Sequence, residues 1–191
     1  MNNVLTEADG LNAAIQTIQV EMYEKLATFW SGDIEGFGRA YKNIANTGKQ
    51  KDTYYRSSKI FTPEVYNSVT KNYGDLFYDT QKSCVFCFLI SDTDDTDDEL
   101  LFTSKIKLVF MTNLNMIYPS SSERVDGKAQ KDAMDVLRNI NGDYEITGIE
   151  RGSENIFNGY TAFGTSFDDM QPLHTFSINF NLNYYLTDKC T

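Results

Sequence analysis

The only histidine of the chain is the residue best suited to acid–base chemistry. His174 follows Asp168 and Asp169, and a histidine beside a carboxylate can act as a general base because its pKa lies near neutral pH. The sequence has neither a Gly-x-Ser-x-Gly turn nor a cysteine–histidine arrangement. We interpret His174 as a structural residue at the start of a strand and predict no catalytic residues. An enzyme built on these three residues remains the alternative.

Two cysteines have the spacing of a redox or zinc motif. Cys84 and Cys87 lie in the apolar run CVFCFLI, residues 84 to 90. Positions i and i+3 of a β-strand point to opposite faces, so one metal ion or one disulfide could not use both thiols without distortion. We predict two buried thiols and no metal site.

A run of carboxylates follows this apolar segment. It comprises Asp92, Asp94, Asp95, Asp97, Asp98 and Glu99. An EF-hand loop needs glycine at its sixth position and glutamate at its twelfth. Counted from Asp92, these positions hold Asp97 and Thr103. We predict a solvated loop or an electrostatic docking element, and no metal or other cofactor.

The charge of the chain is large and unevenly spread. The 191 residues have a formal net charge of −10, which opposes non-specific binding to nucleic acid. The stretch from 39 to 59 is nevertheless basic, with Arg39, Lys42, Lys49, Lys51, Arg56 and Lys59 against the single acid Asp52. Tyrosines interleave these charges, as in a groove for single-stranded nucleic acid, but we favour a patch that faces another protein.

Apolar periodicity predicts two long helices. Leu11, Ile15, Ile18, Met22, Leu26 and Phe29 recur at spacings of three and four, which predicts a helix over about 6–30. The same pattern predicts a second helix over 122–140, and Pro63 suits the first turn of a shorter one over about 63–72. Gly36 and Gly38 lack the third glycine of a dinucleotide loop, so we predict a bend there.

The remaining elements are predicted to be strands. The run 84–90 is apolar on both faces, which is typical of the middle of a covered sheet. With the alternating segment that follows, it predicts a long hairpin over about 84–118 that projects from the domain. Further strands are expected near 143–150 and 156–163. We predict a single α+β domain over 1–191, with a mainly antiparallel sheet and helices packed on one face.

Residues 174 to 186, HTFSINFNLNYYL, alternate almost without exception. The even positions are apolar, whereas the odd positions include Asn179, Asn181 and Asn183. Asparagine can satisfy partners without the desolvation cost of burying a charge, so it suits a face that another subunit covers. We infer that this polar face is an interface.

These segments together resemble a phage tail-completion or tail-terminator (neck ring) protein. The resemblance lies in the helix TEADGLNAAIQTIQVEMYEKLATFW, the hairpin around CVFCFLI and KIKLVFMTNLNMIYP, a further helix and the strand HTFSINFNLNYYL. The style of the sequence also resembles structural proteins of crAss-like phages. The resemblance implies a virion protein made in the host cytoplasm, a six- or twelve-fold homo-oligomeric ring that contacts the portal and other tail proteins, and a channel through which DNA passes without sequence-specific binding.

The surfaces named above supply the candidate interface residues of such a ring. These are Lys49, Lys51, Arg56, Lys59, Asp94, Asp95, Asp97, Asp98, Asn113, Asn115, Asn179, Asn181 and Asn183. The longest apolar run is far shorter than a membrane helix, and we expect a soluble chain without a membrane partner. A second hypothesis is a ligand- or carbohydrate-binding adhesion module that uses tyrosines and Trp30 as a stacking platform.

Overall fold

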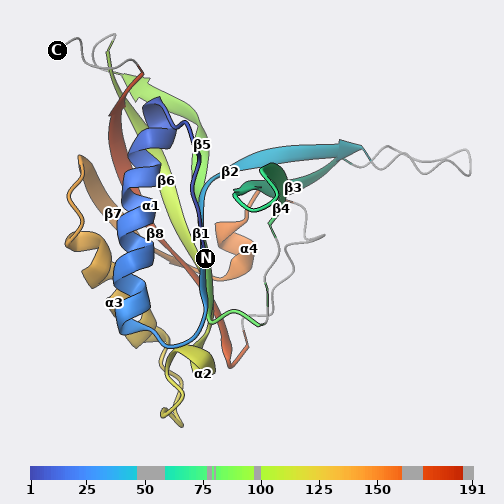
Figure 1. Ribbon diagram of the computed structural model, residues 1–191, viewed down its shortest axis with the longest axis vertical. Coiled ribbons are helices and arrows are strands. Elements are labelled where there is room, and N and C mark those ends of the chain that lie inside the picture. Colours follow the sequence, from blue (N-terminus) through green and yellow to red (C-terminus); the bar gives the residue numbers. More distant parts are fainter. Residues whose placement is uncertain (47–58, 77–78, 80, 97–99, 161–169, 187–191) are drawn as a thin grey trace, which may run out of the picture.

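The computed structural model describes residues 1–46, 59–76, 79, 81–96, 100–160 and 170–186 (Figure 1). Its described strands form one eight-stranded sheet in the order β4-β3-β2-β5-β6-β8-β7, with β1 paired to β2. The elements are β1 Asn2–Asn3, α1 Gly10–Phe29, β2 Ile34–Asn46, β3 Lys59–Asn67, β4 Asn72–Asp75, β5 Cys84–Thr96, β6 Leu101–Asn113, α2 Leu114–Ile117, α3 Asp126–Arg138, β7 Tyr144–Arg151, α4 Ser153–Ile156 and β8 Leu173–Tyr185.

Most neighbouring strands are antiparallel, but two pairs are parallel. β1 and β5 both run parallel to β2, while the β2–β3, β3–β4, β5–β6, β6–β8 and β7–β8 pairs are antiparallel. β6 pairs with β8 along its entire length. The segment predicted to project from the domain, 84–118, is therefore built into the sheet, because β6 has a neighbour on each side.

The element that does extend from the body is formed by β2 and β3 (Figure 1). β2 pairs with β5 as far as Ala40 and with β3 from Tyr41 onward, and a register shift separates Gly36 from Arg39. We call residues 41–46 and 59–64 the β2–β3 arm. Strand β3 runs through Pro63, so the short helix predicted over about 63–72 does not begin there. Proline is tolerated there because the β3–β4 ladder begins only at Glu64.

Both predicted long helices form, with shorter bounds. The apolar stripe of α1 is buried at Leu11, Ile15, Ile18, Met22 and Leu26. Phe29, which the pattern placed in the same stripe, is 64% exposed because it lies in the last turn, beyond the edge of the core. Helix α3 begins at Asp126 and buries Ala129, Ala133, Val136 and Leu137.

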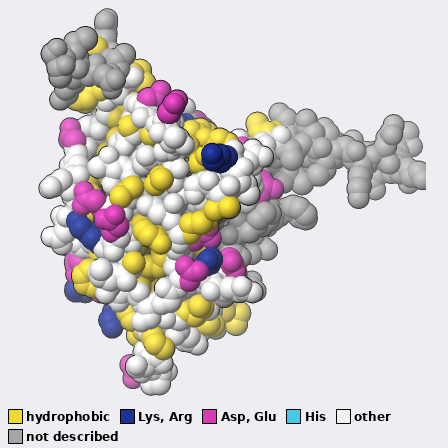
Figure 2. Space-filling view, viewed as in Figure 1, with side chains coloured by type: hydrophobic (Ala, Val, Ile, Leu, Met, Phe, Trp, Pro, Cys, Tyr) yellow, Lys and Arg dark blue, Asp and Glu magenta, His cyan; other side chains and the backbone are white. Residues whose placement is uncertain are grey.

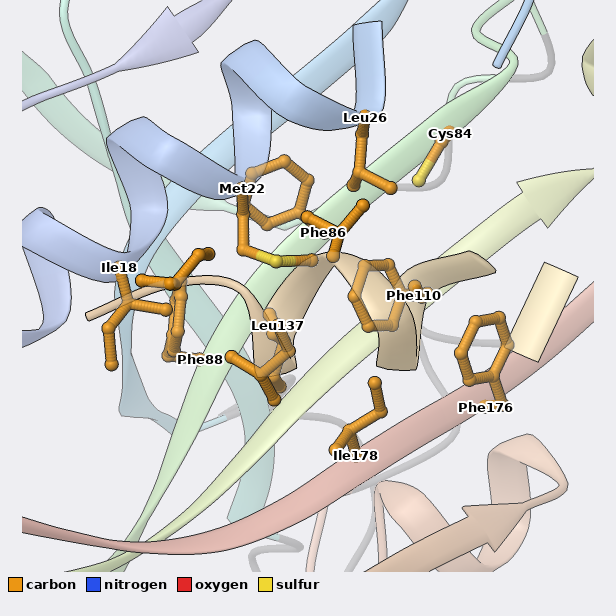
Figure 3. Packing of buried hydrophobic residues seen from close by; sticks show 14 of the residues in the cluster. Ile18, Met22, Leu26, Cys84, Phe86, Phe88, Phe110, Leu137, Phe176 and Ile178 are labelled. Carbon is orange, nitrogen blue, oxygen red and sulfur yellow. The ribbon is translucent and has the colours of Figure 1, made fainter. Parts of the chain in front are cut away.

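The main core lies between these two helices and one face of the sheet. Phenylalanines from three neighbouring strands fill it. Phe86 and Phe88 on β5, Phe110 on β6 and Phe176 on β8 lie there (Figure 3), and Phe180 of β8 belongs to the same cluster. The Phe110 and Phe176 rings are stacked with centroids 4.8 Å apart. Such rings bury a large apolar area, and their contacts fix the positions of the three strands. Outside this core, the helical face carries scattered charges of both signs (Figure 2).

A second, smaller core covers the opposite face of the sheet. Val85, Cys87 and Leu89 on β5 pack there with Ile156 of α4 and with residues near β3. Segment 84–90 is thus covered on both faces, as its composition predicts. The expected strand near 156–163 is instead helix α4 followed by a turn over the part that is described. Helix α4 packs on this second face, so the helices do not all lie on one side.

Candidate functional site

The polar face of β8 opens into a hollow on the sheet face opposite α1 and α3. Its volume is about 600 Å³. The floor comes from the middle of β5, β6 and β8, and the wall comes from Ile156, Asn158 and Tyr160 in and after α4. Asn179 and Asn181 both line it. Two of the three asparagines predicted to form an interface on this strand therefore line a hollow of their own chain.

The strand register arranges four polar side chains on the floor. Lys107 lies opposite Asn179, and Lys105 lies opposite Asn181. These residues occupy odd positions of β6 and β8, so all four point to the same face of the sheet. Gly148 of β7 lies opposite Asn179. A Cβ atom at Gly148 would meet no heavy atom within 4 Å, which leaves space beside Asn179.

Both lysines on the floor have carboxylate partners. Lys107 Nζ lies 2.6 Å from Glu150 Oε2, and Lys105 Nζ lies 3.5 Å from Asp95 Oδ2. The first pair is roughly one-third exposed and the second is largely exposed, so the Lys105 pair contributes at most about 1 kcal/mol. The positive charges of the floor are balanced within the chain.

The amides on the floor keep unused hydrogen-bonding capacity. Asn179 Oδ1 accepts a bond of 2.8 Å from Ser177 Oγ. In the part of the chain that the structure describes, the Asn179 amide nitrogen and both polar atoms of Asn181 have no partner within the protein. Burial raises the pKa of Tyr160 to about 12, and the nearby Cys87 and Asp92 add to the rise. This phenol is protonated at neutral pH and can donate a hydrogen bond.

The other predicted asparagines lie elsewhere. Asn183 accepts from Thr103 at 2.7 Å and donates to Asp143 at 3.0 Å, which ties β8 to its neighbours. Asn113 ends β6, and Asn115 is exposed on α2. The second strand of the hairpin expected over about 84–118 ends at Asn113 because the chain turns into α2, where the Leu114 amide donates to the Pro172 carbonyl at 2.8 Å. The structure does not bring these asparagines together with Asn179.

His174 is buried in a polar network that links α3 to β7 and β8. Gln130 Nε2 lies 2.9 Å from His174 Nε2, and Gln130 Oε1 accepts from Arg151 at 2.8 and 3.1 Å. The amide thus donates to Nε2, so the imidazole proton lies on Nδ1, 3.7 Å from Asp126 Oδ2. With 3% exposure, the ring is held inside the protein. Asp168 and Asp169 lie outside the described residues.

The two cysteines are separated by the sheet, as predicted. Cys84 lies in the main core and Cys87 in the second core, and both are fully buried. Burial raises the pKa of both thiols, to about 12 for Cys87. Thiols with raised pKa values on opposite faces are suited to packing and poorly suited to nucleophilic chemistry.

Trp30 is also buried, at 3% exposure. Its indole nitrogen donates to the Tyr118 hydroxyl at 3.1 Å, and that hydroxyl donates to Asp132 at 2.6 Å. This chain of bonds connects the end of α1 to α3. Trp30 therefore cannot serve as the exposed stacking platform that an adhesion module would need.

The predicted charged residues are described only in part. Asp94 accepts a bond of 2.6 Å from Tyr184, and Asp95 pairs with Lys105, so both are engaged within the chain. Lys59 pairs through its backbone with Asn46 at the end of the arm. Asp97, Asp98, Lys49, Lys51 and Arg56 lie outside the described residues.

Comparisons with family models, with curated proteins and with solved structures found no match to this chain. Among the described residues, no three His, Cys, Asp or Glu side chains are grouped so that they could hold a metal ion. No described helix combines the length and the apolar character needed to span a membrane.

Several residues of the hollow are not evident from sequence periodicity. Alternation along β6 does indicate that Lys105 and Lys107 share a face. Nothing local indicates that Glu150 reaches Lys107, because β7 and β6 meet only through β8. Ile156 and Tyr160 lie in and just after α4, in a segment that the pattern predicts to be a strand. The sequence pattern contains no signal for helix α4, and without this helix the wall of the hollow could not be predicted.

Proposed function

We propose that the protein is a structural subunit of a homo-oligomeric ring in a phage head–tail connector or tail. The observation that carries the proposal is the β2–β3 arm, which leaves the body of the sheet after Ala40. A two-stranded ribbon is marginally stable in water by itself. An arm of this kind gains stability when a neighbouring subunit covers it.

The side chains of the arm and its base support the same proposal. Ile44, in the outer half of β2, is 55% exposed. At the base of the arm, Tyr73 packs edge-on against both Tyr41 and Tyr66, and Tyr73 is 41% exposed. Exposed tyrosine and isoleucine are suited to a covered protein surface, since tyrosine combines a large apolar face with a polar group.

Charge provides a second argument. Residues 41–46 of the arm belong to the basic stretch 39–59, whereas Asp92, Asp94 and Asp95 of the acidic segment lie in the outer part of β5. A ring is built from head-to-tail contacts, in which one surface meets a different surface of the next copy. Opposite charges at separate places favour this arrangement and would act mainly on encounter rate and registry.

Native mass spectrometry and electron microscopy of the purified chain test the proposal. We expect a closed ring that dissociates as salt increases, because exposed ion pairs are screened over about 8 Å at physiological ionic strength. A monomer at every concentration and salt level up to millimolar protein would refute self-assembly into a ring.

A matched pair of variants identifies the contact. Ile44→Glu should abolish the ring because it places a charge on the arm. Phe29→Glu makes the same charge change at a side chain that is 64% exposed on α1, and it should leave the ring intact. Equal effects of the two variants would remove the arm from the interface. In the assembled virion, the portal and other tail proteins would be the further partners, and DNA would pass through the channel.

A further inference from the structure

The hollow on the polar face is of a size that small ligands occupy. Its volume of about 600 Å³ lies within the range of about 300–1,000 Å³ that is usual for small-molecule sites. A sheet face exposed to solvent without a covering element would be flat and would not enclose such a volume. Ile156 of α4 and Tyr160 form a wall above the strands, and Gly148, which lies opposite Asn179, leaves the adjacent position of β7 without a side chain.

The available polar groups of the hollow are uncharged. The amides of Asn181 and Asn158 are without partners in the part of the chain that is described, and Asn179 retains its amide nitrogen after accepting from Ser177. An asparagine amide both donates and accepts hydrogen bonds. A ligand that matches several such amides must carry groups that also donate and accept, as hydroxyl groups do.

The charges beside these amides do not favour an anion. Lys107 is paired with Glu150, Lys105 with Asp95, and Asp92 lies close enough to Tyr160 to raise the pKa of its phenol. The remaining lysine nearby, Lys42, has its Nζ 5.6 Å from the Tyr160 ring centroid. An anionic ligand would have to displace an existing carboxylate partner or accept a neutral field.

Apolar groups complete the lining. Leu89 lies on the floor, and Ile156 and the ring of Tyr160 form the wall. An aromatic ring beside polar amides suits a ligand with one face of C–H groups and a rim of hydroxyls. We propose that the hollow binds a neutral, hydroxyl-rich ligand of monosaccharide or disaccharide size. This site uses different residues from the arm and stands independently of the ring proposal.

The test uses the full-length chain and a panel of neutral sugars. Methyl glycosides of glucose, galactose, mannose and N-acetylglucosamine, together with maltose and lactose, are titrated while amide NMR signals are recorded. We expect at least one sugar to bind saturably at millimolar or lower concentration and to shift the signals of Asn179, Asn181 and Tyr160. Glucuronate and inorganic phosphate, as anionic probes, should bind no more tightly than the best neutral sugar.

Two variants with matched controls place the binding in the hollow. Asn181→Leu removes the unpaired polar atoms and keeps the same number and branching of side-chain heavy atoms, and Gly148→Leu fills the open position beside Asn179. Each should weaken sugar binding at least tenfold. The controls Asn141→Leu and Gly74→Leu lie at exposed positions elsewhere, and they should bind as the parent chain does.

Three results would overturn the proposal. The first is that no sugar binds at concentrations up to 50-fold above the expected dissociation constant of ~1 mM. The second is that phosphate or glucuronate binds more tightly than every neutral sugar. The third is that both hollow variants bind sugar with unchanged affinity. Circular dichroism of each variant establishes that it is folded. The mass of the particle is recorded in parallel, so a failure of ring assembly is seen separately from a failure of sugar binding.

Discussion

Tyr184 donates a hydrogen bond of 2.6 Å to Asp94, and this bond joins β8 to the outer end of β5. The two residues are on strands that are not neighbours, since β6 lies between them. The bond passes across β6 just beyond the register shift between Ile90 and Asp94. It holds the end of β5 in place where β2 has already left the sheet.

Removing this hydroxyl should destabilise the protein and change its response to alkaline pH. Tyr184→Phe should lower the free energy of unfolding at pH 8 by about 0.5–1.5 kcal/mol. Urea unfolding measures this, with Tyr23→Phe on α1 as the control. An equal loss in both variants would mean that the bond to Asp94 adds nothing beyond the effect of removing a hydroxyl.

The pH dependence follows from the raised pKa of the same phenol. Burial first, and then the bond to Asp94, raises the pKa of Tyr184 to about 12. The unfolded value is about 10, so the contribution of Tyr184 is complete below that pH and is lost as the pH rises through the native pKa. In this window the stability should fall by about 1.4 kcal/mol per pH unit for each such group. Tyr184→Phe should reduce that slope.

The network around His174 should contribute to stability. Gln130→Met removes the amide that contacts His174 and accepts from Arg151. We expect a loss of about 1–3 kcal/mol in urea unfolding, because buried polar groups lose their partner. Gln81→Met, at an exposed position, is the control and should change stability by less than about 0.5 kcal/mol. A neutral Gln130→Met would show that the network is dispensable.

Gly36 should tolerate no side chain. A Cβ atom there would lie 2.5 Å from Phe86 Cζ, a ring atom of the main core. Gly36→Ala should therefore cost about 1–3 kcal/mol through overpacking. Gly74→Ala, which meets no atom within 4 Å in strand β4, should be far less costly. Thermal melting compares the two, and similar melting temperatures would refute the steric explanation.

Calcium should have no specific effect on the acidic segment. Asp94 and Asp95 already have partners within the chain, and a hard cation would need several freely arranged oxygen ligands. The melting temperature should be unchanged between EDTA and 0.5 mM calcium, to within about 1 °C, because only a ligand that binds the native state raises it. A rise of several degrees would contradict this prediction.

Periodicity predicted the elements that bury one continuous face. The stripe of α1, the two-sided burial of 84–90 and the alternation of 174–186 all appear in the structure because each depends on one element against one core. Periodicity failed where neighbours decide the outcome. Pro63 lies in a strand because it pairs with Lys42 of β2, and Ile156 lies in a helix because its side chain packs into the second core there.

The candidate site divides in the same way. Alternation places Asn179, Asn181, Lys105 and Lys107 on one face, which follows from residue spacing alone. The wall needs Tyr160, which reaches the hollow through the position of α4, while Gly148 and Glu150 come beside Asn179 and Lys107 through the strand order. These are relations between segments distant in sequence, and single-sequence patterns carry no information about them.

The position of β8 between β6 and β7 has a consequence for synthesis on the ribosome. β6 ends at Asn113, and its partner β8 begins only at Leu173. Until β8 has been translated, β6 has an open edge and Phe110 lacks the ring of Phe176. Such an edge can pair with another chain. Nascent chains that pause between these strands should therefore need protection by chaperones, and folding should be slow because its longest ladder closes a long loop.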